Sequence, residues 1–114
     1  MRELFERLRS LLIWLIALPV FVAACALVWL GSFVLPGRAL EAVLKTGCRA
    51  ILFACGVRVR THGRENLVPG RQVIPMMNHV NFFDPFVFQV AFRPALRGVE
   101  EEAHFRWPIY GSTI

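Results

Sequence analysis

The chain has 114 residues, which is enough for one small domain. Apolar residues make up 56% and charged residues 18%, a more apolar balance than that of an average soluble domain. The net charge is +5, but the basic residues are scattered and form no nucleic-acid motif, so no nucleic-acid partner is expected. This balance favours a membrane surface with anionic lipids, or an anionic substrate. The three cysteines, Cys25, Cys48 and Cys55, show no disulfide or metal-binding spacing and are interpreted as small buried apolar residues.

The N-terminal third of the chain has the pattern of a membrane-associated helix. Residues 2–10 alternate charges with apolar side chains, which predicts a short amphipathic helix. Residues 11–35 carry no charge and would span about 37 Å as a helix, more than the roughly 30 Å hydrocarbon core of a bilayer. Pro19 is expected to kink this helix.

Three interpretations of this apolar segment stay open. It could be a single transmembrane helix, one arm of a membrane-embedded hairpin with residues 38–55 as the return helix, or a cleaved signal ending in the lipoprotein-like box 22–25. Basic residues flank both ends of the segment, so the positive-inside rule gives no orientation. A hairpin or in-plane helix would keep both basic flanks on one side of the membrane, which favours the monotopic arrangement.

The character of the chain changes after residue 55. Pro36-Gly37 predicts a break, and residues 38–55 predict an amphipathic helix that ends before Gly56. We therefore divide the chain into a membrane-associated helical segment, 1–55, and a second unit, 56–114, with an α/β pattern. The elements expected in the second unit are strands at 57–60, 72–77 and 95–101, a turn at 78–84, a helix at 85–92, and a short helix or loop at 104–111.

The residues with the clearest chemical pattern are His79 and Asp84. His79 follows an expected buried strand, and Asp84 precedes Pro85, which predicts that Asp84 is the N-cap of the next helix. An aspartate five residues after a histidine can fold back and accept a hydrogen bond from one imidazole nitrogen, leaving the other free as a base. Without a neighbouring Ser or Cys nucleophile, such a pair suits direct attack by a substrate hydroxyl. The structural alternative is a lone histidine after a strand and an aspartate that only caps a helix.

The segment Asn78-His79-Val80-Asn81-Phe82-Phe83-Asp84 resembles the Asn-His-x4-Asp motif of the lysophosphatidic acid and glycerol-3-phosphate acyltransferases. Residues 63–70, followed by Val73-Ile74, are similar to the segment that leads into this motif. Residues 105–111 look like the second block of the family, which closes on Pro-x-x-Gly. The resemblance covers about residues 40–114.

The resemblance implies a fold and an activity. The fold would be α/β, with an N-terminal membrane helix or helical hairpin followed by the first part of an acyltransferase α/β sandwich. His79 would be the catalytic base and Asp84 would orient it, while Asn78 and Gly111 would contact the substrate. The acyl donor would be acyl-CoA or acyl-carrier-protein, used as a co-substrate without any further cofactor or metal. The partners would be membrane lipid and a lysophospholipid acceptor, at the bacterial inner membrane with the site facing the cytoplasm. Two alternatives stay open: an acyltransferase of the same fold that uses another lipid acceptor, and a non-catalytic membrane-anchored fragment.

Two departures from the family pattern affect these expectations. The second block of the family usually opens with Lys-x-Glu-Leu, whereas residues 101–104 here are Glu-Glu-Ala-His. The third block, of the Glu-Gly-Thr-Arg type, does not occur in the 114 residues. The sequence is therefore expected to be the N-terminal fragment of a protein about twice as long, and these residues alone are not expected to be active.

Overall fold

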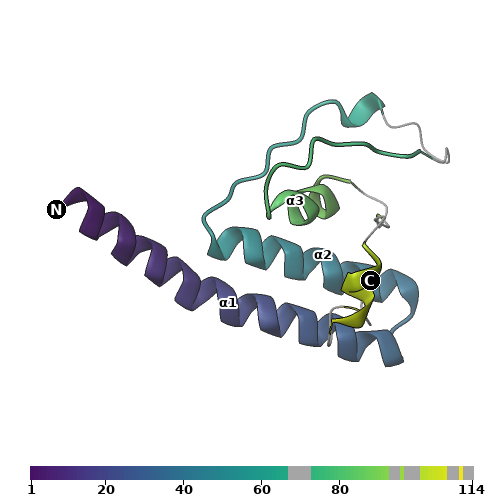
Figure 1. Cartoon of the computed structure of the whole chain (residues 1–114). Helices are drawn as coiled ribbons and strands as arrows, with labels where there is room; N and C mark the ends of the chain where they lie inside the picture. Colours follow the sequence, from purple (N-terminus) through teal and green to yellow (C-terminus); the bar gives the residue numbers. More distant parts are fainter. Residues whose placement is uncertain (67–72, 93–95, 97–100, 108–110, 112–114) are drawn as a thin grey trace.

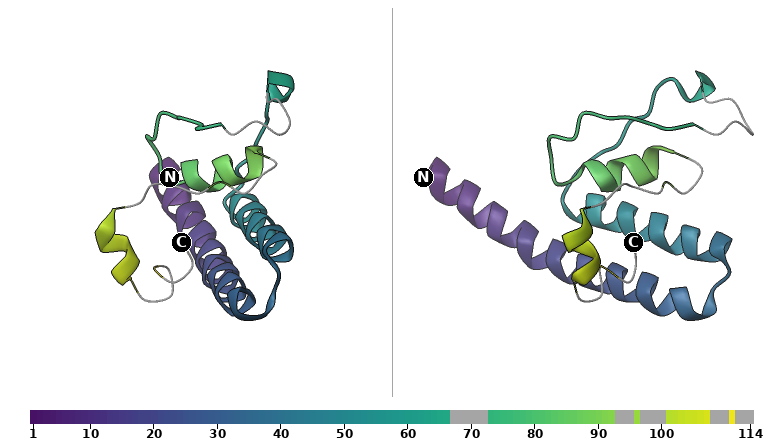
Figure 2. Two further views of the ribbon diagram at one scale, coloured as in Figure 1. Left: turned by 90° about the vertical axis from the view of Figure 1, so that its right-hand side faces the viewer. Right: turned by 45° about the vertical axis from the view of Figure 1, so that its right-hand side comes forward.

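The computed structural model describes residues 1–66, 73–92, 96, 101–107 and 111. Its elements are the helices α1 (Arg2–Val34), α2 (Gly37–Ala54) and α3 (Asp84–Ala91), and the 3-10 helices η1 (Arg64–Asn66) and η2 (Glu102–Arg106). Helices α1 and α2 form a hairpin, and α3 packs mainly on α2 (Figure 1). The N-terminal part of α1 extends past the end of α2 (Figure 1 and the right view of Figure 2).

Helix α1 joins the two segments expected at 2–10 and 11–35 into a single helix of 33 residues. Its first turns are stabilised by the ion pairs Arg2–Glu6 and Arg7–Glu3, each four residues apart on one face. The helix continues through Pro19 and is long and apolar enough, by length and composition, to cross a membrane. Only Ala17, Val28 and Gly31 of α1 are buried, so most of its large apolar side chains are exposed.

The return helix expected at 38–55 is present as α2, and the turn before it is fixed by proline. The backbone N–H of Leu35 donates to Gly31 O at 2.8 Å and closes α1. Pro36 then takes an extended conformation at the N-cap of α2, and its carbonyl accepts hydrogen bonds from the backbone N–H groups of Ala39 and Leu40. At the other end Gly56, at φ 72°, forms a Schellman motif in which Gly56 N bonds Phe53 O and Val57 N bonds Leu52 O. The predicted stop before Gly56 is confirmed.

The two arms of the hairpin approach closely where small residues face one another. A Cβ atom placed on Gly47 of α2 would lie 3.0 Å from the Cβ of Ala24 in α1. The absence of a side chain at Gly47 therefore sets the distance between the helices at this level.

Substitution of Gly47 by leucine should force the hairpin apart. We expect the free energy of unfolding to fall by about 1–3 kcal/mol, because overpacked side chains require backbone shifts. Thermal unfolding followed by circular dichroism in detergent micelles would measure the change. Gly37→Leu is the matched control, since a Cβ at Gly37 meets no atom within 4 Å. Equal stability of the two variants would contradict the close contact at Gly47.

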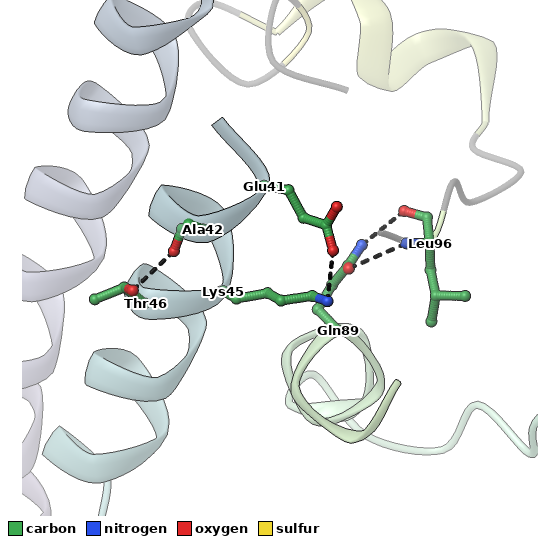
Figure 3. Close-up of polar contacts among 6 residues, drawn as sticks. All are labelled: Glu41, Ala42, Lys45, Thr46, Gln89 and Leu96. Carbon is green, nitrogen blue, oxygen red and sulfur yellow. Dashed lines mark hydrogen bonds and ion pairs between the residues drawn. The ribbon is translucent and has the colours of Figure 1, made fainter. Parts of the chain in front are cut away.

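The charged residues of α2 lie on one stripe of the helix, and α3 covers part of it. Arg38, Glu41, Lys45 and Arg49 recur at helical spacing. Lys45 is only 8% exposed, and its Nζ lies 2.7 Å from Glu41 Oε1. Figure 3 shows this ammonium next to Gln89 of α3, whose amide donates to Leu96 O at 2.8 Å and accepts from Leu96 N at 3.3 Å. The polar side of α2 is thus the side that holds α3, while the opposite side packs on the uncharged part of α1, residues 11–34.

The expected α/β sandwich is wrong for the part of the chain that the structure describes, which contains helices and extended segments but no strand. Residues 57–60 are extended, and their side chains alternate as expected, with Val57 and Val59 half-buried and Arg58 and Arg60 exposed. They are not a strand because no hydrogen-bonded ladder joins them to another segment in the described residues. The alternation is present, but it reflects contact of one side of the segment with the helices.

The second expected strand, at 72–77, is also absent from the residues of this segment that the structure describes, 73–77. Residues 73–77 are irregular, and Ile74 is 91% exposed instead of buried. Pro75 cannot donate to a ladder, and this segment runs over α3 without pairing to 57–60 in Figure 1. Of the third expected strand, at 95–101, only Leu96 and Glu101 lie within the described residues. The helix expected at 85–92 is confirmed as α3, and η2 (Glu102–Arg106) overlaps only the start of the short helix or loop expected at 104–111.

Candidate active site

A tight turn before α3 brings together the residues of the Asn-His-x4-Asp segment. One carboxylate oxygen, Asp84 Oδ2, accepts hydrogen bonds from the backbone N–H of Asn81 at 2.7 Å and of Val80 at 2.8 Å. His79 Nδ1 lies 3.1 Å from the same oxygen. The side-chain oxygen of Asn81 accepts from Phe83 N at 3.0 Å, and Asp84 N donates to Asn81 O at 3.1 Å. The turn is therefore closed by local hydrogen bonds in both directions.

Asp84 is the first residue of α3, and the predicted N-cap role is wrong. The N-cap is Phe83, no side chain caps the helix, and the Asp84 carboxylate bonds backwards to the turn. The backbone N–H groups of Asn81 and Val80, followed by the hydrogen bond from His79, hold the pKa of this carboxyl below its ordinary value of 3.8. Asp84 is therefore a carboxylate anion at neutral pH, in the first turn of a helix where negative charge is favourable.

The geometry fixes the protonation pattern of the imidazole. A carboxylate can only accept hydrogen bonds, so His79 Nδ1 carries a proton and donates it to Asp84 Oδ2. In the neutral ring Nε2 then has a free lone pair and can act as a base. The His79 side chain is 61% exposed and that of Asp84 only 22%, so the base is open to a substrate while the carboxylate is partly shielded. The predicted pairing of the two side chains is thus present.

Aromatic rings attach this turn to the helical hairpin. The ring of Phe82 lies 5.7 Å from that of Phe86 in α3, and Phe86 lies edge-on 6.2 Å from Phe21 in α1. Such aromatic contacts stabilise an arrangement by about 0.5–1.5 kcal/mol each. The sequence interpretation missed these residues, although the spacing of Phe82 and Phe86, four residues apart, could have indicated that they meet at the start of a helix.

The two expected substrate-binding residues do not join the pair. Asn78 is exposed, and no hydrogen bond among the described residues links it to His79 or Asp84. Gly111 lies after η2 and donates its backbone N–H to Trp107 O at 2.9 Å. A Cβ at Gly111 would collide with the backbone carbonyl of Phe105, so a packing requirement explains this glycine.

The described residues offer no metal site beside this pair, and comparisons with other proteins give no match. Within the described residues no group of three or more His, Cys, Asp or Glu side chains is placed to hold a metal ion. No protein-family model, curated protein or solved structure matches the chain. The His79–Asp84 pair and the helices around it are therefore the features of the described chain that bear on its function.

Proposed function

We propose that the chain carries the acid–base pair of an acyltransferase that moves a fatty acyl group from a thioester to a hydroxyl of lysophosphatidic acid. The observation that supports this most strongly is the contact of His79 Nδ1 with Asp84 Oδ2 at 3.1 Å, with the rest of the imidazole exposed. No hydroxyl or thiol of the described residues is hydrogen-bonded to His79, so the nucleophile is taken to be the substrate hydroxyl itself.

In the proposed reaction, His79 Nε2 removes the proton of the glycerol hydroxyl. The hydroxyl oxygen forms a bond to the thioester carbonyl carbon, and the carbon–sulfur bond then breaks. The proton passes from His79 to the leaving thiolate, so the imidazole returns to its neutral state. Asp84 keeps the imidazole in the tautomer with Nδ1–H and stabilises the imidazolium that forms during the reaction. The acyl donor is acyl-CoA or acyl-carrier-protein, and the chemistry uses no further cofactor.

A non-catalytic role of the same turn is the second candidate. The two backbone hydrogen bonds to Asp84 Oδ2 close the turn whether or not His79 does chemistry. In that case the chain would be a membrane-anchored scaffold. Acyl transfer from oleoyl-CoA or oleoyl-acyl-carrier-protein to lysophosphatidate, measured for the natural gene product and its His79→Ala variant, separates the two candidates. Absence of transfer from both donors would refute the acyltransferase proposal, whereas transfer to another lipid acceptor alone would redirect it.

The proposed location is the surface of a membrane, with the hairpin embedded in one leaflet. Helix α2 pairs with the second half of α1, and α3 lies on the polar stripe of α2 (Figures 1 and 3). If residues 11–35 crossed the bilayer, the Lys45–Glu41 pair and α3 would sit at hydrocarbon depth, where charged groups are costly. An in-plane hairpin keeps the uncharged part of α1, residues 11–34, in lipid and places the polar stripe of α2, α3 and His79 on the aqueous side. For a bacterial protein we place this side in the cytoplasm, where acyl thioesters are made.

Cysteine labelling can distinguish the in-plane hairpin from a transmembrane helix. In a background without the three native cysteines, Ser10→Cys and Gly37→Cys mark the two ends of the apolar segment, and both positions are exposed. We expect a membrane-impermeant maleimide to label both from the same side of sealed vesicles. Labelling of the two positions from opposite sides would show that the segment crosses the bilayer.

A further inference from the structure

A groove lies where the end of α2, the segment after it and α3 meet. It has a volume of about 200 Å³ and is lined by Arg49, Leu52, Phe53, Val57, Val59 and Val90. The half-buried Val57 and Val59 face it, whereas the alternating Arg58 and Arg60 are exposed outside it. Val90 belongs to α3, the helix that begins at Asp84, and lies about 9 Å along the helix axis from it. The groove and the candidate active site are therefore built on the same helix.

The lining combines apolar walls with one cation. Five of the six lining residues are aliphatic or aromatic, and none is acidic. Arg49 is exposed and makes no ion pair within the described part of the chain, in contrast to Lys45, which is one turn earlier and pairs with Glu41. An unpaired guanidinium beside an apolar wall is complementary to an anionic group on an apolar chain, and guanidinium binds phosphate through two parallel hydrogen bonds.

We propose that this groove binds the lysophospholipid acceptor, with part of its single acyl chain on Leu52, Phe53, Val57, Val59 and Val90 and its phosphate on Arg49. This inference rests on the proposed acyltransferase function and names the acceptor site for it. The volume is below the roughly 300–1,000 Å³ of pockets that enclose whole drug-sized ligands, so the groove holds a stretch of one chain and leaves the rest in the membrane.

Photolabelling tests the position of the acyl chain. The probe is a lysophosphatidate with a diazirine in its acyl chain, applied to the natural gene product in lipid nanodiscs. We expect crosslinks on peptides that contain residues 52–59 and Val90. Arg49→Gln should lower the labelling about ten-fold, because a charge-assisted hydrogen bond to the phosphate is lost. Arg58→Gln is the matched control, since it removes the same charge outside the groove and should change the labelling by less than about two-fold.

Two further measurements keep the test decisive. The diazirine analogue of monoacylglycerol, which has no phosphate, should label the unmodified protein and the Arg49→Gln variant equally weakly. Val59→Trp should lower labelling by both probes, because it fills the groove without changing its charge, while circular dichroism checks the helix content. Equal labelling of the Arg49→Gln variant and the unmodified protein by the lysophosphatidate probe would overturn the proposal. Displacement by oleoyl-CoA but not by lysophosphatidate would also overturn it, by assigning the groove to the donor.

The test of the groove and the test of the acyltransferase function can fail independently. If His79→Ala abolishes acyl transfer while Arg49→Gln changes neither labelling nor the Michaelis constant for lysophosphatidate, the reaction stands and the groove assignment is wrong. If Arg49→Gln lowers labelling while His79→Ala leaves any lipid acyl transfer unchanged, the groove binds lysophospholipid but the proposed chemistry is wrong.

Discussion

The His79→Ala variant is expected to lower kcat/KM for acyl transfer to lysophosphatidate by about 10²–10⁴-fold, the usual contribution of a positioned general base. The hydroxyl of glycerol is a weak nucleophile, and without the imidazole its proton must pass to water. His79 is exposed and its side chain contacts Asp84 Oδ2, so alanine leaves the two backbone hydrogen bonds of the turn in place. The measurement is a steady-state assay in membranes with radiolabelled oleoyl thioester.

His62→Ala is the control for this experiment. His62 is an exposed histidine of the described chain outside the turn, so its removal should leave kcat/KM unchanged. Helix content measured by circular dichroism shows whether each variant is folded. An unchanged rate for a folded His79→Ala variant would exclude the general-base mechanism and favour the scaffold.

Substitution of Asp84 by asparagine should lower kcat on the order of 10²–10⁴-fold while the turn stays closed. In the native protein Val80 N and Asn81 N lie 2.8 and 2.7 Å from Asp84 Oδ2. The side-chain carbonyl oxygen of asparagine can accept the same two hydrogen bonds. It carries no charge, so it stabilises the imidazolium less, and its NH₂ group can favour the wrong imidazole tautomer. Asp84→Ala, in which both backbone bonds are lost, should in addition lower stability. Full activity of Asp84→Asn together with an unstable Asp84→Ala would mean that the carboxylate only closes the turn.

The lowered pKa of Asp84 gives the direction of its pH dependence. A carboxyl whose pKa is lower in the folded state than in the unfolded state stabilises the fold at pH values above its ordinary pKa of 3.8. That contribution is lost as the pH falls through the lowered pKa, so it is constant through neutral pH. The difference in unfolding free energy between the unmodified protein and the Asp84→Asn variant, measured by thermal unfolding, should therefore be constant between about pH 5 and 8 and shrink as the pH falls below 3.8.

The helices could be predicted from the sequence, whereas the strands predicted at 57–60 and 72–77 are absent from the residues that the structure describes. The uncharged run of α1, the Pro36 break and the Gly56 stop depend on backbone geometry and local composition, which the sequence carries directly. A strand depends on a partner elsewhere in the chain. The alternation at Val57–Arg60 is compatible both with a sheet and with an extended segment that lies on helices, and only the packing distinguishes them.

In the candidate site, too, contacts between residues close in sequence could be predicted, whereas contacts between distant segments could not. The approach of His79 and Asp84 follows from a spacing of five residues and a turn, and it was predicted. The Asp-Pro pair predicts an N-cap, so the sequence indicates neither the two backbone donors to Asp84 Oδ2 nor the position of Asp84 as the first residue of α3. The contact of Phe86 with Phe21 depends on how α3 packs on the hairpin, which no local pattern states.

The hydrogen bonds of the turn have a consequence for how the site is assembled. All three donors to Asp84 Oδ2 lie three to five residues before it, so their formation closes only a very short loop. Such contacts can form early and quickly, before the distant parts of a chain meet. The geometry of the His79–Asp84 pair then depends only on the residues between them, so an insertion between the two would separate them. Rearrangements elsewhere in the chain would leave this local geometry intact. An intact pair seen by spectroscopy would therefore be a poor reporter of whether the rest of the molecule has folded.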